Sequence, residues 1–171
     1  MARQKQGGVR GDKMTRSNQI GLAGEFYAIH KLFLEGYEAS LTLGNTKGID
    51  ILVYNPRNEK HFKVEVKTST TIGNERLFGR NMKWIMNKKH EDARDENLVY
   101  CFVFIDKTGK ERTRIFFYRP SDINLYIYTQ HKKWLHAEHK RKVKDTDMRI
   151  FRIDLENVDK NKFQDNFKIF E

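Results

Sequence analysis

Residues 48–69, GIDILVYNPRNEKHFKVEVKTS, carry the clearest structural pattern in this chain. Two runs within them, 49–54 and 61–67, are rich in β-branched and aromatic residues and are typical of β-strands. Residues 55–58 between the runs, Asn-Pro-Arg-Asn, have the composition of a turn. The stretch therefore predicts an antiparallel hairpin.

The hairpin places polar side chains among apolar ones near one of its ends. Side chains alternate between the two faces of a strand, so Glu65 and Lys67 share a face that Val66 does not. A turn centred near residue 58 places Asp50 across from about Val66, and hence beside Glu65 or Lys67. The sequence alone does not fix this register.

This group of residues is the first candidate functional site. Carboxylates are costly to place on a half-buried sheet unless something compensates, and a divalent cation is a common compensation. Asp50, Glu65 and the carbonyl of Val66 supply oxygen ligands for Mg²⁺, and Lys67 is placed to hold an attacking water. These residues predict a metal-dependent phosphodiesterase. The alternative is a cross-strand ion-pair cluster on a solvated face.

A helix is expected over residues 18–35, ahead of the hairpin. Apolar residues recur there at spacings of four, three and four and mark one face for packing: Leu22, Phe26, Ile29 and Phe33. Glu25 lies within or beside this stripe. It is a candidate to orient a metal-bound water or bind a second metal, and the alternative is a salt-bridged glutamate at the rim.

The remaining segments predict an α/β domain. Residues 98–105 form a continuous apolar run that indicates a central buried strand containing the one cysteine, Cys101. Strands are also expected over 37–42, 113–118 and 148–155, and a short strand around residue 84 followed by a helical or looped stretch. A helix with Ser121 as its cap is expected to run through Trp134, and the C-terminal segment is expected to be a polar, partly helical tail.

Composition indicates one domain and an anionic partner. The 171 residues divide into a basic, Gly-rich arm at 1–17, which either frays or settles on phosphates, and a domain at 18–171. Lys and Arg number 33 against 23 Asp and Glu, for a net charge of +10, which favours nucleic acid or an anionic membrane surface. No apolar run approaches the about 20 residues of a membrane-spanning helix, so we expect a soluble, cytoplasmic protein.

Basic residues concentrate in the predicted helical region around 121–145. The candidates for phosphate contact are Lys132, Lys133, Lys140, Arg141 and Lys142, together with Lys47 in the turn before Asp50. The alternative is an ordinary solvated face.

Aromatic residues and histidines in the same region have two interpretations each. Tyr126, Tyr128 and Trp134 either stack on unpaired bases or pack as core and rim residues. The histidines at 131, 136 and 139 have partly helical spacing, but no acid or cysteine completes a zinc set, so a basic helix is favoured over a zinc site.

Residues 24–69 together resemble the PD-(D/E)xK nuclease superfamily, also called restriction-endonuclease-like, in the layout of its Holliday-junction-resolvase-type members. The resemblance implies an αβββαβ core with a mixed central sheet flanked by helices. It matches Asp50 to the metal-binding aspartate, Glu65 and Lys67 to the (D/E)xK element, and Glu25 to the first-helix glutamate. Ile49 stands where the name motif has proline, a departure that many members share.

The resemblance implies a Mg²⁺- or Mn²⁺-dependent endonuclease acting on DNA, and many relatives act as homodimers. A rival hypothesis is a nucleic-acid-binding module of the same fold with little or no catalysis. A third is a structural or protein-interaction domain with a large exposed apolar patch.

Overall fold

The computed structural model describes residues 9–42 and 48–171, with side chains from residue 16 onward. Lys47 lies outside the described residues. The elements are α1 (Val9–Leu34), β1 (Glu38–Leu41), β2 (Ile51–Asn55), β3 (Lys60–Ser69), β4 (Ile72–Glu75), β5 (Gly79–Asn87), η1 (Lys88–Glu91), β6 (Leu98–Phe104), β7 (Arg114–Tyr118), α2 (Pro120–His136), β8 (Met148–Asp154), η2 (Val158–Lys160) and η3 (Phe167–Phe170). None of the described helices has the length and apolar character to cross a membrane.

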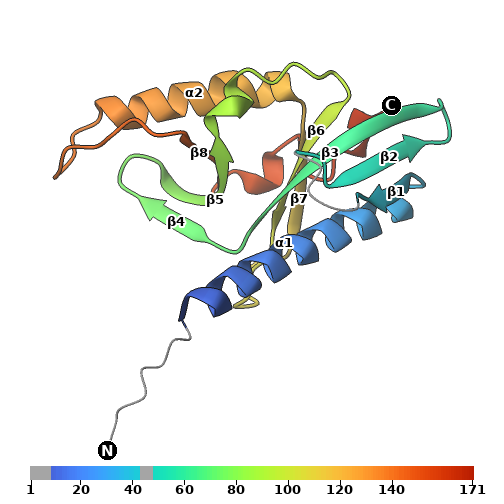
Figure 1. Cartoon of the computed structure of the whole chain (residues 1–171), viewed down its shortest axis with the longest axis horizontal. Coiled ribbons are helices and arrows are strands. Elements are labelled where there is room, and N and C mark those ends of the chain that lie inside the picture. Colours follow the sequence, from blue (N-terminus) through green and yellow to red (C-terminus); the bar gives the residue numbers. More distant parts are fainter. Residues whose placement is uncertain (1–8, 43–47) are drawn as a thin grey trace, which may run out of the picture.

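A mixed five-stranded sheet in the order β1-β2-β3-β6-β7 forms the centre of the molecule. Strands β3 and β6 are parallel, and every other pair of neighbouring strands in this sheet is antiparallel. Figure 1 shows α1 along one side of this sheet and α2 on the opposite side, where β4, β5 and β8 form a second sheet. The prediction of a mixed α/β fold is therefore confirmed, and so are the hairpin at 49–67 and the central strand at 98–105, in which Cys101 is fully buried.

Two apolar clusters cover the two faces of the central sheet. On one face Ala28 and Leu32 of α1 pack with the inward side chains of β2, β3 and β6 and with Phe167 and Phe170 from the C-terminus. On the other, Trp84 packs with aromatic residues of β6, β7 and β8 and with α2. The sheet is buried on both sides, as a strand with consecutive apolar residues requires.

Helix α1 differs from the prediction in both its start and its inner face. It begins at Val9, so residues 9–17 are helical rather than part of an arm that ends at residue 17. Leu22, Phe26 and Phe33 are about half exposed, and the buried positions are Gly24, Ala28 and Leu32. The reason is close packing: a Cβ on Gly24 would overlap Thr68 Oγ1 and lie 2.9 Å from Thr68 Cβ. Small residues allow α1 to approach β3, and that places the large apolar stripe outside.

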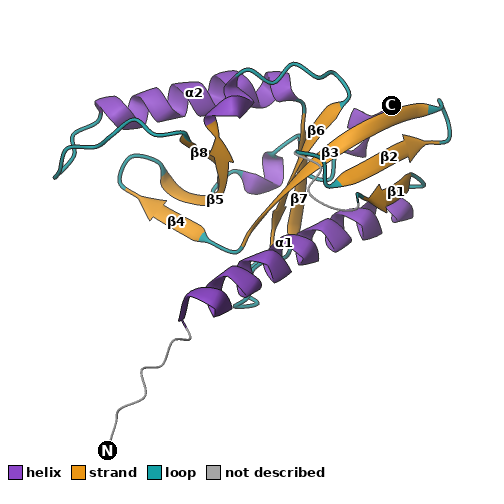
Figure 2. Ribbon diagram, in the orientation of Figure 1, coloured by secondary structure: helices purple, strands orange, loops and turns teal. Residues whose placement is uncertain are grey.

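The connection from β3 to β6 also departs from the expected αβββαβ order. Parallel neighbours need a crossover, which in that core is a helix. Here the crossover consists of the β4–β5 hairpin and the short 3₁₀ helix η1, and the second α-helix follows β7 instead (Figure 2). The order agrees with the prediction only as far as β3.

The C-terminal third corrects three smaller expectations. Arg119, not Ser121, precedes the first turn of α2, and its backbone N–H donates to the Asp122 carboxylate at 3.1 Å. Helix α2 ends at His136, so residues 137–145 are not helical. The expected polar tail instead delivers Phe167 and Phe170 to the core, where Tyr37 Oη donates to the Phe167 carbonyl.

Candidate active site at the edge of the central sheet

Asp50 lies immediately before β2, at the edge of β3. The pairing of Ile51 with Val64 sets the register, and the Asp50 N–H donates to the Val64 carbonyl at 2.8 Å. Asp50 and Ile51 therefore both lie opposite Val64, so the regular ladder ends at Ile51 and Asp50 departs from the predicted alignment with Val66. Its carboxylate reaches Val66, whose N–H donates to Asp50 Oδ2 at 2.7 Å.

Glu65 and Lys67 project together from β3 on the face opposite α1. Lys67 Nζ lies 2.7 Å from Glu65 Oε1, and the Glu65 side chain is only 6% exposed. The Val66 side chain packs in the α1-side core. Because its N–H points to Asp50, the Val66 carbonyl is presented toward the same edge of the strand. The structure thus brings Asp50, Glu65, Lys67 and the Val66 backbone together.

Burial makes the charged form of Asp50 costly. Desolvation is the largest influence and raises the pKa of this carboxyl group, with Glu65 adding to the rise. The Val66 N–H and the Lys67 and Lys89 ammonium groups oppose it without reversing it. Burial is thus the main reason that the charged carboxylate is costly here, and a bound divalent cation would offset that cost.

Glu25 approaches from α1. Burial raises the pKa of its carboxyl group, and the charge of Asp50 raises it further. Glu25 is therefore near enough to Asp50 for their charges to interact. Its carboxyl group is half-buried, and no described contact joins it to Glu65 or Lys67.

The donor set suits a cation that keeps several water ligands. Within residues 9–42 and 48–171, no three His, Cys, Asp or Glu side chains gather closely enough to form a metal cage. Asp50 and Glu65 with the Val66 carbonyl offer two carboxylates and one carbonyl, and Mg²⁺ commonly takes one or two protein carboxylates and water. The residues present therefore fit Mg²⁺ or Mn²⁺ better than they fit zinc.

Gly48 brings the chain close over Glu65. Its φ of +77° lies in the left-handed region, and a Cβ there would lie 3.3 Å from Glu65 Oε2 and 3.8 Å from Lys89 Nζ. Any larger residue would be strained in its backbone and crowd the carboxylate. The backbone at Gly48 therefore lies close to the Glu65 carboxylate.

Two functional candidates were missed by sequence reasoning, His90 and Tyr100. His90 Nδ1 lies 2.8 Å from Tyr100 Oη, and His90 Nε2 lies 3.6 Å from Glu65 Oε1. Burial lowers the pKa of His90 and raises that of Tyr100. Tyr100 lies beside Glu65 through the parallel pairing of 63–69 with 98–104, a register that the sequence pattern does not specify. His90 lies on η1, and no pattern in the sequence indicates that η1 packs beside β3.

The basic candidates lie elsewhere. Lys132 and Lys133 are on α2, with Lys132 Nζ over the Tyr128 ring, and Lys140, Arg141 and Lys142 are exposed beyond its end. In Figure 1 this end of α2 and the following loop lie at the opposite side of the molecule from β1 and β2. No described contact joins these residues to Asp50 or Glu65.

The histidines and aromatic residues of this region have local partners. His131 Nε2 pairs with Asp145 at 2.8 Å, and His139 Nε2 lies 2.6 Å from the Trp134 carbonyl. Tyr126 packs against Phe151 and donates to the Arg152 carbonyl, which agrees with a packing role. Tyr128 is about half exposed.

Comparisons with known proteins do not assign a family. No family model and no curated protein matches the chain. Among solved structures, the bacterial homing endonuclease I-Ssp6803I is similar with a TM-score of 0.44 and 13% identity, over 78% of this chain and 72% of that one. A likeness of this size carries no conclusion about activity, so function has to be argued from the site.

Proposed function

We propose that this protein is a Mg²⁺- or Mn²⁺-dependent endonuclease that hydrolyses phosphodiester bonds in DNA. One observation carries the proposal: the Asp50 carboxylate accepts from the backbone N–H that lies between Glu65 and Lys67. Two acids, a carbonyl and a lysine therefore meet at one sheet edge, with the Asp50 pKa raised rather than lowered. A purely structural ion-pair cluster would stabilise the charged carboxylate.

Each residue has a distinct role in this proposal. Asp50, Glu65 and the Val66 carbonyl would hold the cation, which supplies Lewis acidity at the phosphate and lowers the pKa of a bound water. Lys67, partly exposed and anchored on Glu65, donates a hydrogen bond to the attacking water and offsets charge that develops on the phosphate. Glu25 orients that water from the α1 side. Water then adds to phosphorus and gives up a proton to solvent, while the P–O bond to the leaving nucleotide breaks and the leaving oxygen takes a proton from solvent.

Charge favours a nucleic acid as the substrate. The net charge of +10 attracts a polyanion, and the exposed Lys140, Arg141 and Lys142 add positive charge at a second place on the surface. Contacts of this kind position a backbone without reading its sequence.

The experiment is cleavage of branched, duplex and single-stranded DNA, and of RNA, with Mg²⁺ or Mn²⁺. Lys67→Ala is compared with Lys63→Ala, a matched control on the same face of the same strand, where Lys63 pairs with the exposed Asp95 at 2.8 Å. We expect Lys67→Ala to lose about 100-fold or more in rate, and Lys63→Ala to cut like the wild type.

Two other results would change the conclusion. If the wild type cuts no substrate but binds DNA in a strongly salt-dependent manner, the protein is a binding module of this fold. Equal losses in Lys67→Ala and Lys63→Ala would mean that Lys67 contributes only surface charge.

A further inference from the structure

A buried pair behind Glu65 has no part in the mechanism so far. Tyr100 is fully buried and His90 is 4% exposed, and their rings meet edge to face with centroids 5.3 Å apart. Tyr100 pairs with Glu65 across the β3–β6 ladder, and η1 brings His90 against both. Polar groups are rarely buried this completely without a specific arrangement of donors and acceptors.

Donor and acceptor counting fixes that arrangement. A neutral imidazole has one N–H and one acceptor nitrogen, and a tyrosine hydroxyl has a single proton to donate. If His90 Nδ1 carried the proton, the Nε2 lone pair would face the Glu65 carboxylate 3.6 Å away. The favourable alternative has Tyr100 Oη donating to Nδ1 at 2.8 Å and the Nε2–H directed at Glu65 Oε1.

The two oxygens of Glu65 are then differently engaged. Oε1 is held by Lys67 at 2.7 Å and approached by His90. Oε2 lies on the Gly48 side, 3.3 Å from where a Cβ of that residue would be. None of the residues that the structure describes donates a hydrogen bond to Oε2.

We propose that Tyr100 and His90 are positioning residues that fix the Glu65 carboxylate so that Oε2 faces the cation. This inference rests on the proposed metal site at Asp50 and Glu65. The Tyr100 hydroxyl sets the tautomer of His90, and the His90 Nε2–H and Lys67 together fix the plane of the carboxylate through Oε1. Interactions that orient a metal ligand in this way typically change affinity by about 10- to 100-fold when they are removed.

The test measures Mn²⁺ binding by calorimetry, separately from cleavage. Tyr100→Phe keeps the ring and deletes the hydroxyl, and we expect its Mn²⁺ dissociation constant to rise about 10-fold or more. Tyr118→Phe is the matched control: Tyr118 faces Tyr100 across β6–β7, is buried, and shares a hydrogen bond with Asn161 at 3.1 Å. It should lose one partly buried tyrosine hydrogen bond and retain wild-type Mn²⁺ affinity.

Substitutions of His90 sharpen the test. His90→Gln keeps a side-chain N–H that can reach Glu65, whereas His90→Leu does not, so Gln should restore part of the affinity that Leu loses. ¹⁵N spectra of the unaltered protein give a second measurement that requires no variant to fold. They should show His90 protonated at Nε2 and unprotonated at Nδ1, and the opposite tautomer would overturn the proposal.

The outcomes separate this inference from the proposed function. Unchanged Mn²⁺ affinity in Tyr100→Phe and His90→Leu overturns the positioning role while leaving a cleaving enzyme intact. A wild type that binds Mn²⁺ but cuts nothing refutes the nuclease, and the positioning role is still decided by the affinities. A wild type that does not bind Mn²⁺ overturns both.

Discussion

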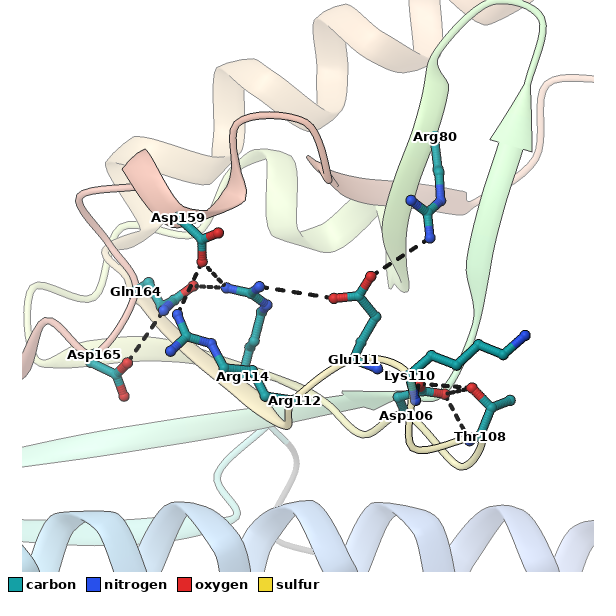
Figure 3. Close-up of polar contacts among 10 residues, drawn as sticks. All are labelled: Arg80, Asp106, Thr108, Lys110, Glu111, Arg112, Arg114, Asp159, Gln164 and Asp165. Atoms are coloured by element: carbon teal, nitrogen blue, oxygen red, sulfur yellow. Dashed lines mark hydrogen bonds and ion pairs between the residues drawn. The ribbon is translucent and has the colours of Figure 1, made fainter.

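In two polar clusters of this molecule, the surroundings shift the pKa of an aspartate in opposite directions. In the cluster around Arg114, Asp159 pairs with Arg114 at 2.6 Å and Arg112 at 3.0 Å, as Figure 3 shows. The hydrogen bond and charge of Arg114 lower the pKa of Asp159. At the site on β3, burial raises the pKa of Asp50 despite the neighbouring Lys67.

This difference distinguishes an ion-pair cluster that stabilises the fold from a candidate functional site. The Arg114 guanidinium, 7% exposed, also bonds Gln164 at 2.9 Å and so links β7 to the C-terminal segment. Glu111 likewise meets guanidinium groups, because it faces both Arg80 and Arg114 (Figure 3). At the Asp50 site burial outweighs the neighbouring ammonium groups, and carboxyl groups perturbed in this way cluster at functional sites.

The largest effect expected from this contrast is on catalysis. Asp50→Asn should lower DNA cleavage by about 100- to 1000-fold, because the amide removes a charged metal ligand without changing shape. Asp159→Asn makes the same substitution in the Arg114 cluster and should leave the rate within about twofold. Steady-state cleavage with saturating Mn²⁺ measures both, and a comparable loss in Asp159→Asn would end the distinction between the two clusters.

A second effect comes from the helix that brings Glu25 to Asp50. Gly24→Ala should destabilise the fold by about 1–3 kcal/mol, since its Cβ would overlap Thr68, a β-branched residue on the strand. Gly21→Ala is the matched control, one turn earlier with open space around it. It should be neutral or up to about 1 kcal/mol more stable through helix propensity.

Urea denaturation measures both glycine variants. Thr68→Ala in the Gly24→Ala background removes the overlapping Oγ1 and should recover part of the loss. If Gly24→Ala is as stable as Gly21→Ala, α1 does not pack on β3 as described and Glu25 has no fixed place beside Asp50.

The same helix shows what the sequence could and could not predict. Leu22, Phe26 and Phe33 have the spacing of a packed face, yet they are about half exposed. Periodicity records where large apolar residues align, whereas the distance between a helix and a sheet depends on the small residues, here Gly24 and Ala28. The helix was predictable, but its rotation was not.

The site was predictable to the extent that it is local. Asp50, Glu65 and Lys67 lie within one hairpin, whose turn and alternation restrict the register to within a residue. His90 and Tyr100 join through the β3–β6 crossover, whose course depends on the pairing of β5 with β8, more than 60 residues later. No local pattern encodes such a pairing. Phe170 likewise reaches the core from a polar segment because only the folded sheet provides its neighbours.

The smallest effect is the pH dependence of stability, and its sign differs between the two clusters. Asp50 has a folded pKa above its ordinary 3.8, so its folded state binds protons more tightly and the stability it contributes declines as pH rises through that folded value. Asp159 has a folded pKa below 3.8, so its contribution is present above 3.8 and is lost as pH falls through the folded value.

Denaturation of the wild type and of the two Asn variants at a series of pH values measures how the free energy of unfolding of each changes with pH. The stability of Asp50→Asn relative to wild type should rise as pH increases from about 4 through the folded pKa of Asp50. That of Asp159→Asn should be lowest above about pH 4 and recover in more acidic solution. Saturating Mn²⁺ at neutral pH should remove the advantage of Asp50→Asn, because a cation bound only by the native wild type offsets the buried charge. If Mn²⁺ leaves that advantage unchanged, Asp50 is a partly buried acid and not a ligand, and the two clusters differ only in burial.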